Sequence, residues 1–302
     1  MPSLNDVIKE VQSRSSEKDS QAIDTYRLEQ IQRLSALTQR NVICYYSGWL
    51  TTTGSNPYLN IDDMDKNGFM NAVEGMDCSS GLDLVLHTPG GQITAAESLV
   101  YYLRQKFGTD IRVIIPQMAM SAGTMIACAA KTIIMGKQSC IGPFDPFVRN
   151  VSAFAVLEEF ERACDEIERK PHTLPLWQVM IGKYPAAFLE DCKRAIALAS
   201  SIVPKWLNDN MFLELDREDR EERVKKIMSY LNNPQETKEH SRHVHATKAK
   251  SLGLIVEMLE DNQQLQDVVL TLHHSYLLTL LNTKAAKIIE TQHGKRFLIS
   301  NS

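Results

Sequence analysis

The sequence predicts an α/β fold built around a mostly parallel sheet. Short runs of strand length and apolar or β-branched character carry this prediction: 82–88 (LDLVLHT), 111–117 (IRVIIPQ) and 132–137 (TIIMGK). Helix-forming stretches separate them, over 92–107 and from Ser121 onward. Strands and helices that alternate at such short spacing are typical of parallel strands joined by crossover helices. The near-continuous apolar character of 82–88 further indicates a strand covered on both faces.

The flanking segments complete the predicted organisation. The run 41–49 (NVICYYSGW) is typical of a further strand, and apolar residues recur at every third position before it, at Leu28, Ile31, Leu34 and Leu37. That spacing predicts an amphipathic helix. Residues 151–231 show a helical pattern, and after 263 the apolar residues again mark one helical face. We therefore expect a helical N-terminal arm outside the core at 1–40, a central α/β domain at 41–262, and a helical C-terminal extension at 263–302 that packs on the core or on a neighbouring subunit.

Composition narrows the class of protein. The 302 residues carry a formal net charge of −4, so the chain lacks the basic surface that nucleic-acid binding requires. The six cysteines form no CxxC pair, which argues against a zinc site and against a disulfide framework. The first twenty residues have no apolar core of a signal peptide, and no run of about eighteen apolar residues predicts a membrane span. The expectation is a cytoplasmic protein with no metal or other cofactor.

Two short motifs follow neighbouring predicted strands. PGG (89–91) comes after the strand 82–88, and MSAGT (120–124) comes after the strand 111–117. Because ligands in open α/β sheets bind at the carboxyl ends of the strands, Gly91 and Ser121 are expected to face one crevice. A serine at a strand-to-helix junction is either a helix N-cap or a nucleophile displayed on a tight turn. As a nucleophile, Ser121 would have an oxyanion hole in the backbone N–H groups of Gly91 and Ala122.

Longer stretches around these motifs carry a resemblance to a known family: LDLVLHTPGG (82–91), AMSAGTMIA (119–127), IMGKQSCIGPFDP (134–146) and HATKAKSLGL (245–254). They resemble the proteolytic subunit of the Clp protease and the wider ClpP/crotonase superfamily. The resemblance is closer to one branch, the serine dehydrogenase proteinase (SDH) family, which is related to signal peptide peptidase A. It implies a ClpP/crotonase-like fold of repeated ββα units, with 41–262 as the catalytic domain of a serine peptidase. It also implies assembly into a homo-oligomer.

The general base is less clearly marked than the nucleophile. In the Clp protease the catalytic histidine falls where this chain has IGPFDP (141–146), which contains Asp145 and no histidine. The family's triad acid lies just upstream of a segment that matches 249–254, and here that place holds His240 and His243. In the signal peptide peptidase branch a lysine is the base, which makes Lys170 a candidate. We favour His240, with His243 and Lys170 as alternatives, against the reading that these histidines belong to a solvated loop.

Three functions compete on these grounds. The leading one is a serine peptidase that cleaves peptides or unfolded proteins through Ser121. A crotonase-like acyl-CoA enzyme would use the same oxyanion hole without the nucleophile. A non-catalytic scaffold would keep the fold and lack the base. The chain has no GxxxxGK[ST] loop of its own, and the sequence does not show whether an ATP-driven unfoldase is a partner.

A calcium-loop pattern also occurs at 63–74 (DMDKNGFMNAVE). It matches the spacing of EF-hand ligands from Asp63 to Glu74. The preceding segment is not helical and no second loop exists to pair with it, so we expect no calcium site here.

Overall fold

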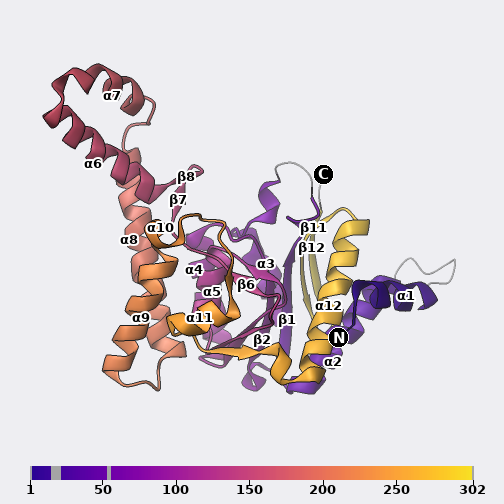
Figure 1. The fold of residues 1–302 in the computed structure, drawn as a ribbon. Coiled ribbons are helices and arrows are strands. Elements are labelled where there is room, and N and C mark those ends of the chain that lie inside the picture. Colours follow the sequence, from indigo (N-terminus) through magenta and orange to yellow (C-terminus); the bar gives the residue numbers. More distant parts are fainter. Residues whose placement is uncertain (1, 15–21, 53–55, 301–302) are drawn as a thin grey trace.

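The computed structural model describes residues 2–14, 22–52 and 56–300 (Figure 1). Within these residues a seven-stranded sheet lies at the centre, in the order β10-β5-β3-β2-β1-β11-β12. Its parallel strands are β1 (Asn41–Ser47), β2 (Leu82–His87), β3 (Ile111–Ile115), β5 (Thr132–Met135) and β10 (Val256–Met258). The antiparallel hairpin of β11 (Ala285–Thr291) and β12 (Arg296–Ser300) extends it beyond β1. The predicted mostly parallel α/β core is confirmed.

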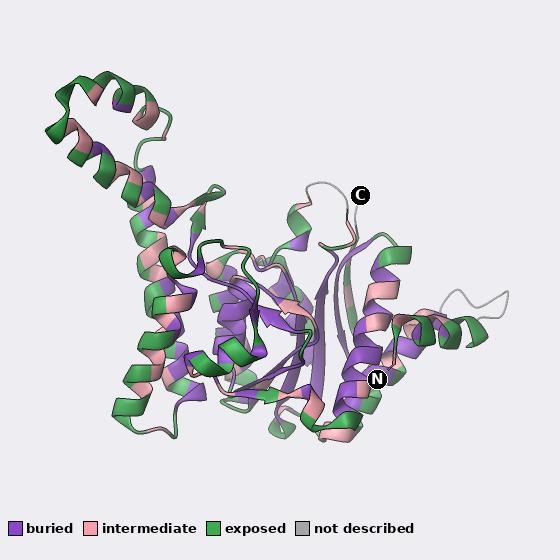
Figure 2. Cartoon of the chain, in the orientation of Figure 1, coloured by how far each residue is buried: buried purple, intermediate pink, exposed green. Residues whose placement is uncertain are grey.

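Helices cover both faces of this sheet (Figures 1 and 2). One face packs against α3 (Met64–Val73), α4 (Ile93–Phe107) and α5 (Ala122–Cys128), and the other against α2 (Ala22–Thr38) and α12 (Gln263–Asn282). Strand β2 shows why its sequence is continuously apolar. Leu84 and Leu86 pack in the hydrophobic cluster with α3, α4 and α5, and Val85 packs in the cluster with α2 and α12. Successive side chains of this strand are therefore buried on opposite faces of the sheet.

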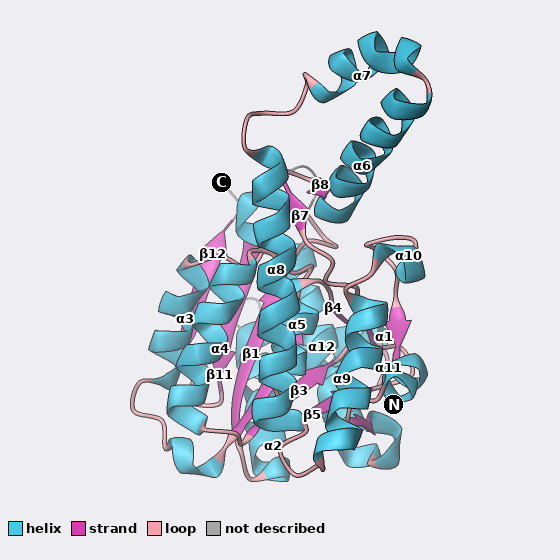
Figure 3. Ribbon diagram, turned by 90° about the vertical axis from the view of Figure 1, so that its left-hand side faces the viewer, coloured by secondary structure: helices cyan, strands magenta, loops and turns pink. Residues whose placement is uncertain are grey.

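A helical projection extends from this body (Figures 1 and 3). It consists of α6 (Ala153–Arg169), α7 (Leu174–Ile181) and the first part of α8 (Phe188–Trp206), which runs back to the sheet. A short hairpin of β7 (Phe147–Val148) and β8 (Val151–Ser152) leads into α6. The other elements are α1 (Leu4–Arg14), α9 (Arg217–Leu231), α10 (Pro234–Thr237), α11 (Ala246–Leu252), 3₁₀ turns at Pro57–Leu59, Cys78–Ser80, Pro171–Thr173 and Leu259–Asp261, and a π-helical turn at Leu207–Met211. No helix in the described part of the chain is both long and apolar enough to cross a membrane.

Both predicted extensions need correction. The N-terminal segment is helical where it is described, but α2 is not an arm outside the core, because its Ile31 and Leu34 are fully buried against the sheet. The predicted C-terminal helix is correct for Gln263–Asn282 and wrong after it, where the chain forms β11 and β12. Strand β11 is buried throughout and pairs with β1 along its length. It thereby supplies partners for backbone groups that an exposed sheet edge would leave unpaired.

A buried ion pair fastens these two ends of the chain to the core. The Arg27 guanidinium on α2 is fully buried, and its Nε lies 2.6 Å from Oε2 of Glu290 on β11. The same guanidinium donates to the Thr279 hydroxyl of α12, and the Tyr276 hydroxyl donates to Glu290. Because each charge is out of reach of solvent, either one alone would be strongly destabilising.

Substitution of one partner of this pair tests its role. We expect Glu290→Ala to lower the free energy of unfolding by about 3–5 kcal/mol, because it leaves the buried Arg27 charge with only the partly exposed Asp24 carboxylate as an ionic partner. Glu190→Ala removes the acid of an exposed pair with Lys193 and serves as the control, with an expected effect below about 1 kcal/mol. Urea denaturation measures both variants. Equal effects of the two substitutions would contradict the assigned role of Glu290.

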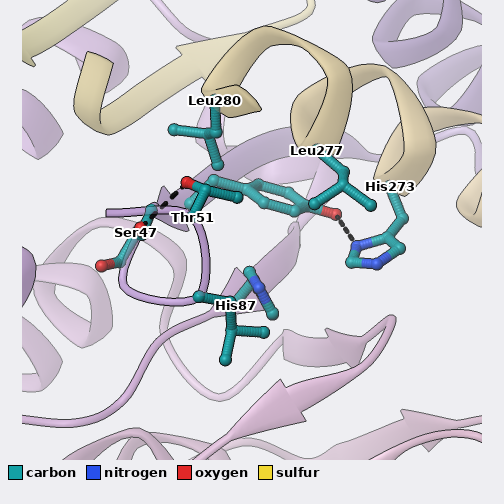
Figure 4. Close-up of a pocket in the computed structure, with 9 residues that line it drawn as sticks. Ser47, Thr51, His87, His273, Leu277 and Leu280 are labelled. Carbon is teal, nitrogen blue, oxygen red and sulfur yellow. Dashed lines mark hydrogen bonds between the residues drawn. The ribbon is translucent and has the colours of Figure 1, made fainter. Parts of the chain in front are cut away.

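Buried histidines sit between the sheet and α12. His87, at the end of β2, and His273, on α12, line a small cavity together with Ser47, Thr51, Leu277 and Leu280 (Figure 4). The ring centroids of His87 and His273 are 5.3 Å apart, and Nδ1 of His273 is 3.4 Å from the Tyr46 hydroxyl oxygen. Burial lowers the pKa of His273 to about 3 and also lowers the pKa of His87 well below its ordinary value, with a further contribution from the neighbouring His273.

These pKa shifts predict a loss of stability in acid. Both histidines stay neutral in the folded chain, whereas in the unfolded chain they take up protons below about pH 6.5. Above that pH the two histidines therefore do not lower the free energy of unfolding. Below it, each histidine lowers the free energy of unfolding by about 1.4 kcal/mol per pH unit as the pH drops toward the folded-state pKa values. Urea denaturation between pH 8 and 4 should show a shallower pH dependence for His273→Gln than for the unsubstituted chain. Parallel curves would contradict the prediction.

Candidate active site

Ser121 occupies a strained turn between β4 (Met118–Ala119) and α5. Its backbone has φ 50° and ψ −117°, a conformation that residues with a side chain rarely adopt. The side chain makes no capping hydrogen bond to α5, and the hydroxyl has no hydrogen-bond partner among the described residues. Ser121 is also partly exposed, whereas every residue of α5 is buried. The N-cap reading therefore does not explain this serine, and a nucleophile displayed on a sharp strand-to-helix turn has this geometry.

The glycine loop after β2 lies directly against Ser121. A Cβ atom added to Gly90, whose φ is +100°, would lie 2.6 Å from the Met120 carbonyl oxygen and 2.7 Å from the Ser121 Cβ. A Cβ on Gly123 would lie 2.4 Å from Cγ2 of Thr88. The small residues of both motifs thus allow the two strand-end loops to touch. The PGG loop and Ser121 therefore lie next to each other, as the order of the predicted strands led us to expect.

The backbone N–H groups of Gly91 and Ala122 have no hydrogen-bond partner within the described residues. Gly91 lies beside Ile61, but the bridging bonds come from its neighbours: the Ile61 N–H donates to the Gly90 carbonyl at 2.7 Å and the Gln92 N–H donates to the Ile61 carbonyl at 2.9 Å. In a parallel bridge of this kind the N–H of the central residue points to the opposite side. Ala122 is the first residue of α5, so its N–H has no acceptor within the helix. Both groups are free to bind an anionic oxygen.

A second, small sheet positions the candidate base. Its strands are β4, β6 (Cys140–Ile141) and β9 (Val244–His245), with β6 in the middle. Ala119 pairs with Ile141 in parallel, and Ile141 pairs with Val244 in antiparallel orientation. The ends of β4 and β6 and the start of β9 therefore lie at the same edge. Ser121 follows β4, Asp145 follows β6, and His240 precedes β9 at this edge.

His240 is held by a buried carboxylate. Its Nδ1 lies 2.9 Å from Oδ1 of Asp145, whose side chain is only 2% exposed, while the His240 side chain is 29% exposed. When His240 is neutral, Nδ1 donates to the carboxylate and the lone pair is on Nε2. The ring of Phe147 packs against the imidazole with the ring centroids 4.4 Å apart. Asp145 and His240 thus have the geometry of an imidazole oriented by a carboxylate, a pair that can serve as the base of a nucleophilic serine.

The structure does not bring the alternative bases into this arrangement. His243 is exposed on the loop before β9, and its ring contacts His245 rather than a carboxylate. Lys170 is exposed and directly follows α6, a helix of the projection (Figure 3). His87 is enclosed in the cavity beneath α12 described above, where it cannot take up protons readily. Of the candidate bases, His240 alone has the bond to Asp145.

The sequence did not reveal that Asp145 contacts His240. Its position in IGPFDP marks where the resembling family has a histidine, and His240 stands where that family has its acid. These two differences from the resembling family are complementary, since one position has an acid in place of a histidine and the other a histidine in place of an acid. Only the pairing of β6 with β9 shows that the two side chains meet.

The calcium-loop pattern forms no loop in the structure. Residues Met64–Val73 are helix α3, and Asp65 is buried with its carboxylate bonded to the Lys287 ammonium at 2.7 Å and to the Tyr45 hydroxyl at 2.9 Å. Glu74 binds Lys295 instead. The carboxylates of Asp65 and Glu74, two of the ligands that the pattern would offer to calcium, are therefore bonded to protein groups. Across the described ranges, no cluster of three or more His, Cys, Asp or Glu side chains suits a metal ion.

Comparison with known proteins identifies relatives of this chain. Two uncharacterized proteins of Methanocaldococcus jannaschii are similar to it. One is 28% identical over 201 residues, which cover 66% of this chain and 61% of the relative. The other is 30% identical over 207 residues, which cover 68% of this chain and 62% of the relative. The match thus spans about three fifths of each relative.

A solved structure of a Listeria monocytogenes ClpP1 point mutant is 12% identical and has a TM-score of 0.38, with 77% of this chain and 99% of that chain covered. The family model for the ClpP-like SDH-type serine proteinases matches residues 16–276, which is most of this chain. The chain belongs to the family of ClpP-like SDH-type serine proteinases.

Proposed function

We propose that the chain is a serine peptidase in which Ser121 is the nucleophile, His240 the general base and Asp145 the carboxylate that orients it. The observation that carries this proposal is the Asp145–His240 hydrogen bond at the same sheet edge as the strained, unpartnered Ser121. The backbone N–H groups of Gly91 and Ala122 form the oxyanion hole. No metal or organic cofactor enters this chemistry.

The acylation step follows from these positions. The Ser121 hydroxyl oxygen attacks the carbonyl carbon of the scissile peptide bond, and its proton passes to Nε2 of His240. The carbonyl oxygen becomes an oxyanion and accepts hydrogen bonds from the Gly91 and Ala122 N–H groups. Collapse of the tetrahedral intermediate breaks the C–N bond, and His240 returns its proton to the departing amine. Asp145 keeps Nδ1 protonated throughout, so Nε2 is the atom that faces the serine.

Deacylation uses the same groups with water as the nucleophile. His240 removes a proton from water, the resulting hydroxide attacks the acyl carbon, and the same oxyanion hole holds the second tetrahedral intermediate. Its collapse restores the Ser121 hydroxyl with the proton from His240 and releases the carboxylic acid. Ser121 and His240 are not hydrogen-bonded to each other in the structure, and such contacts commonly tighten only when substrate binds.

We infer that the substrates are peptides or unfolded proteins and that the chain acts in the cytoplasm as a homo-oligomer. Family membership supports this view, and the partly exposed positions of Ser121 and Gly91 are consistent with access of a peptide to them. A crotonase-like acyl-CoA enzyme is disfavoured, because it would have no use for a strained serine or for the Asp145–His240 pair. A scaffold would likewise gain nothing from the strain at Ser121.

Covalent labelling tests the nucleophile directly. A fluorophosphonate probe should modify the purified chain at Ser121, as located by mass spectrometry, and Ser121→Ala should abolish the adduct. The expected reason is that only an activated serine reacts with the probe. An unlabelled chain across pH 5 to 9, with folding verified by circular dichroism, would contradict the peptidase proposal and favour a scaffold.

The assignment of the base is tested by matched substitutions. His240→Ala should reduce the labelling rate of Ser121 by at least about a thousandfold, and Asp145→Asn by roughly a thousandfold to ten-thousandfold, because the imidazole loses its tautomer and orientation. Lys170→Ala and His243→Ala are the controls and should label at the unsubstituted rate. A larger loss in either control than in His240→Ala would overturn the choice of base.

The close approach of the glycine loop gives a further prediction. Gly90→Ala should slow the labelling of Ser121 by at least about a hundredfold, because the new methyl group would displace the Gly91 N–H relative to the serine. Gly75→Ala is the matched control, since Gly75 also has a positive φ of +69° but has no atom within 4 Å of an added Cβ. Both substitutions put a side chain on a residue with a positive φ and therefore cause the same kind of backbone strain. Only the Gly90 variant should lose reactivity.

A further inference from the structure

The β7–β8 hairpin directs one aromatic side chain at the candidate base. Its turn residues Arg149 and Asn150 have φ values of 52° and 65°, which suit a tight two-residue hairpin. Val148 pairs with Val151, and Val148 packs with the cluster of α6 and α8 that includes Phe188. Successive residues of a strand point to opposite faces, so Phe147 faces away from that cluster. Its ring meets His240 instead, at a centroid separation of 4.4 Å and an interplanar angle of 45°.

Stability of the fold does not account for this contact. Phe147 is 45% exposed and belongs to none of the hydrophobic clusters of the described residues. A large apolar ring kept half in solvent contributes little to folding compared with a buried one. The contact it does make is with the imidazole whose other partner is the Asp145 carboxylate.

We propose that Phe147 is a positioning residue for His240, a proposal that rests on the proposed peptidase function. Asp145 fixes only Nδ1, so the imidazole could still turn about that hydrogen bond and swing Nε2 away from Ser121. The Phe147 ring blocks this rotation from one side. The aromatic face also attracts a cation, so it favours the imidazolium that forms when His240 accepts the Ser121 proton.

Labelling kinetics with the fluorophosphonate probe test the proposal on the full-length chain. Phe147→Ala should lower the second-order labelling rate of Ser121 at its optimum by roughly tenfold, through lost restraint and lost cation attraction. The acid limb of the pH–rate profile should move to lower pH by roughly half a unit, because the protonated ring loses its favourable contact. Phe147→Tyr keeps the aromatic face and should restore both the rate and the profile.

Val151→Ala is the matched control, because it removes another exposed apolar side chain (37% exposed) from the same hairpin without a ring contact to His240. It should leave rate and profile unchanged, and equal melting temperatures should show that all variants fold. If the unsubstituted chain labels and Phe147→Ala matches it in rate and profile, the role of Phe147 is overturned while the peptidase proposal stands. A slower Phe147→Ala with an unshifted profile and no rescue by tyrosine would also overturn it. An unlabelled parent chain would instead remove the peptidase proposal itself.

Discussion

The pairing of β6 with both β4 and β9 is the constraint on which the candidate site depends. These strands are only two residues long, yet they bring together loops that are far apart in the sequence. Parallel pairing aligns the ends of β4 and β6, and antiparallel pairing places the start of β9 beside them. The Thr124 hydroxyl reinforces this alignment, because it donates to the Ala119 carbonyl and accepts from the Gly142 N–H. The hydroxyl therefore links α5, β4 and the loop that leads to Asp145.

The main sheet supplies the rigidity that this small sheet lacks. Strands β2 and β3 are covered by helices on both faces, and the loops that carry Gly91 and Ser121 leave from their carboxyl ends. Strand β11 closes the side of the sheet next to β1, and the buried Arg27–Glu290 pair ties that strand to α2. Strain at Ser121 can persist because this surrounding structure determines the positions of both flanking elements. The fold thus stabilises a turn that would be unfavourable in isolation.

The sequence predicts local elements and strand-end motifs well, because both depend on short-range patterns. The strands at 82–88 and 111–117 and the approach of the glycine loop to Ser121 follow from apolar periodicity and from the geometry of parallel sheets. The hairpin β11–β12 was not predicted, because its pairing partner β1 lies more than two hundred residues earlier in the chain. The Asp145–His240 contact is equally non-local, because its partners are 95 positions apart in the chain. Two-residue strands such as β6 and β9 leave no periodic signal at all.

Chemistry constrains the spatial order of the site more than its order along the chain. A serine nucleophile whose base is a histidine needs an imidazole nitrogen toward it and a carboxylate behind the imidazole, whichever loop provides each group. In the proposed site the loop after β6 provides the carboxylate and the loop before β9 provides the histidine, the reverse of the Clp protease arrangement that the sequence resembles. The two loops lie side by side at one edge of the small sheet, so an exchange of their side chains preserves the sequence of contacts from carboxylate to imidazole. The burial of Asp145 at 2% exposure against 29% for His240 fits this order, because the carboxylate lies inside and the imidazole is partly exposed.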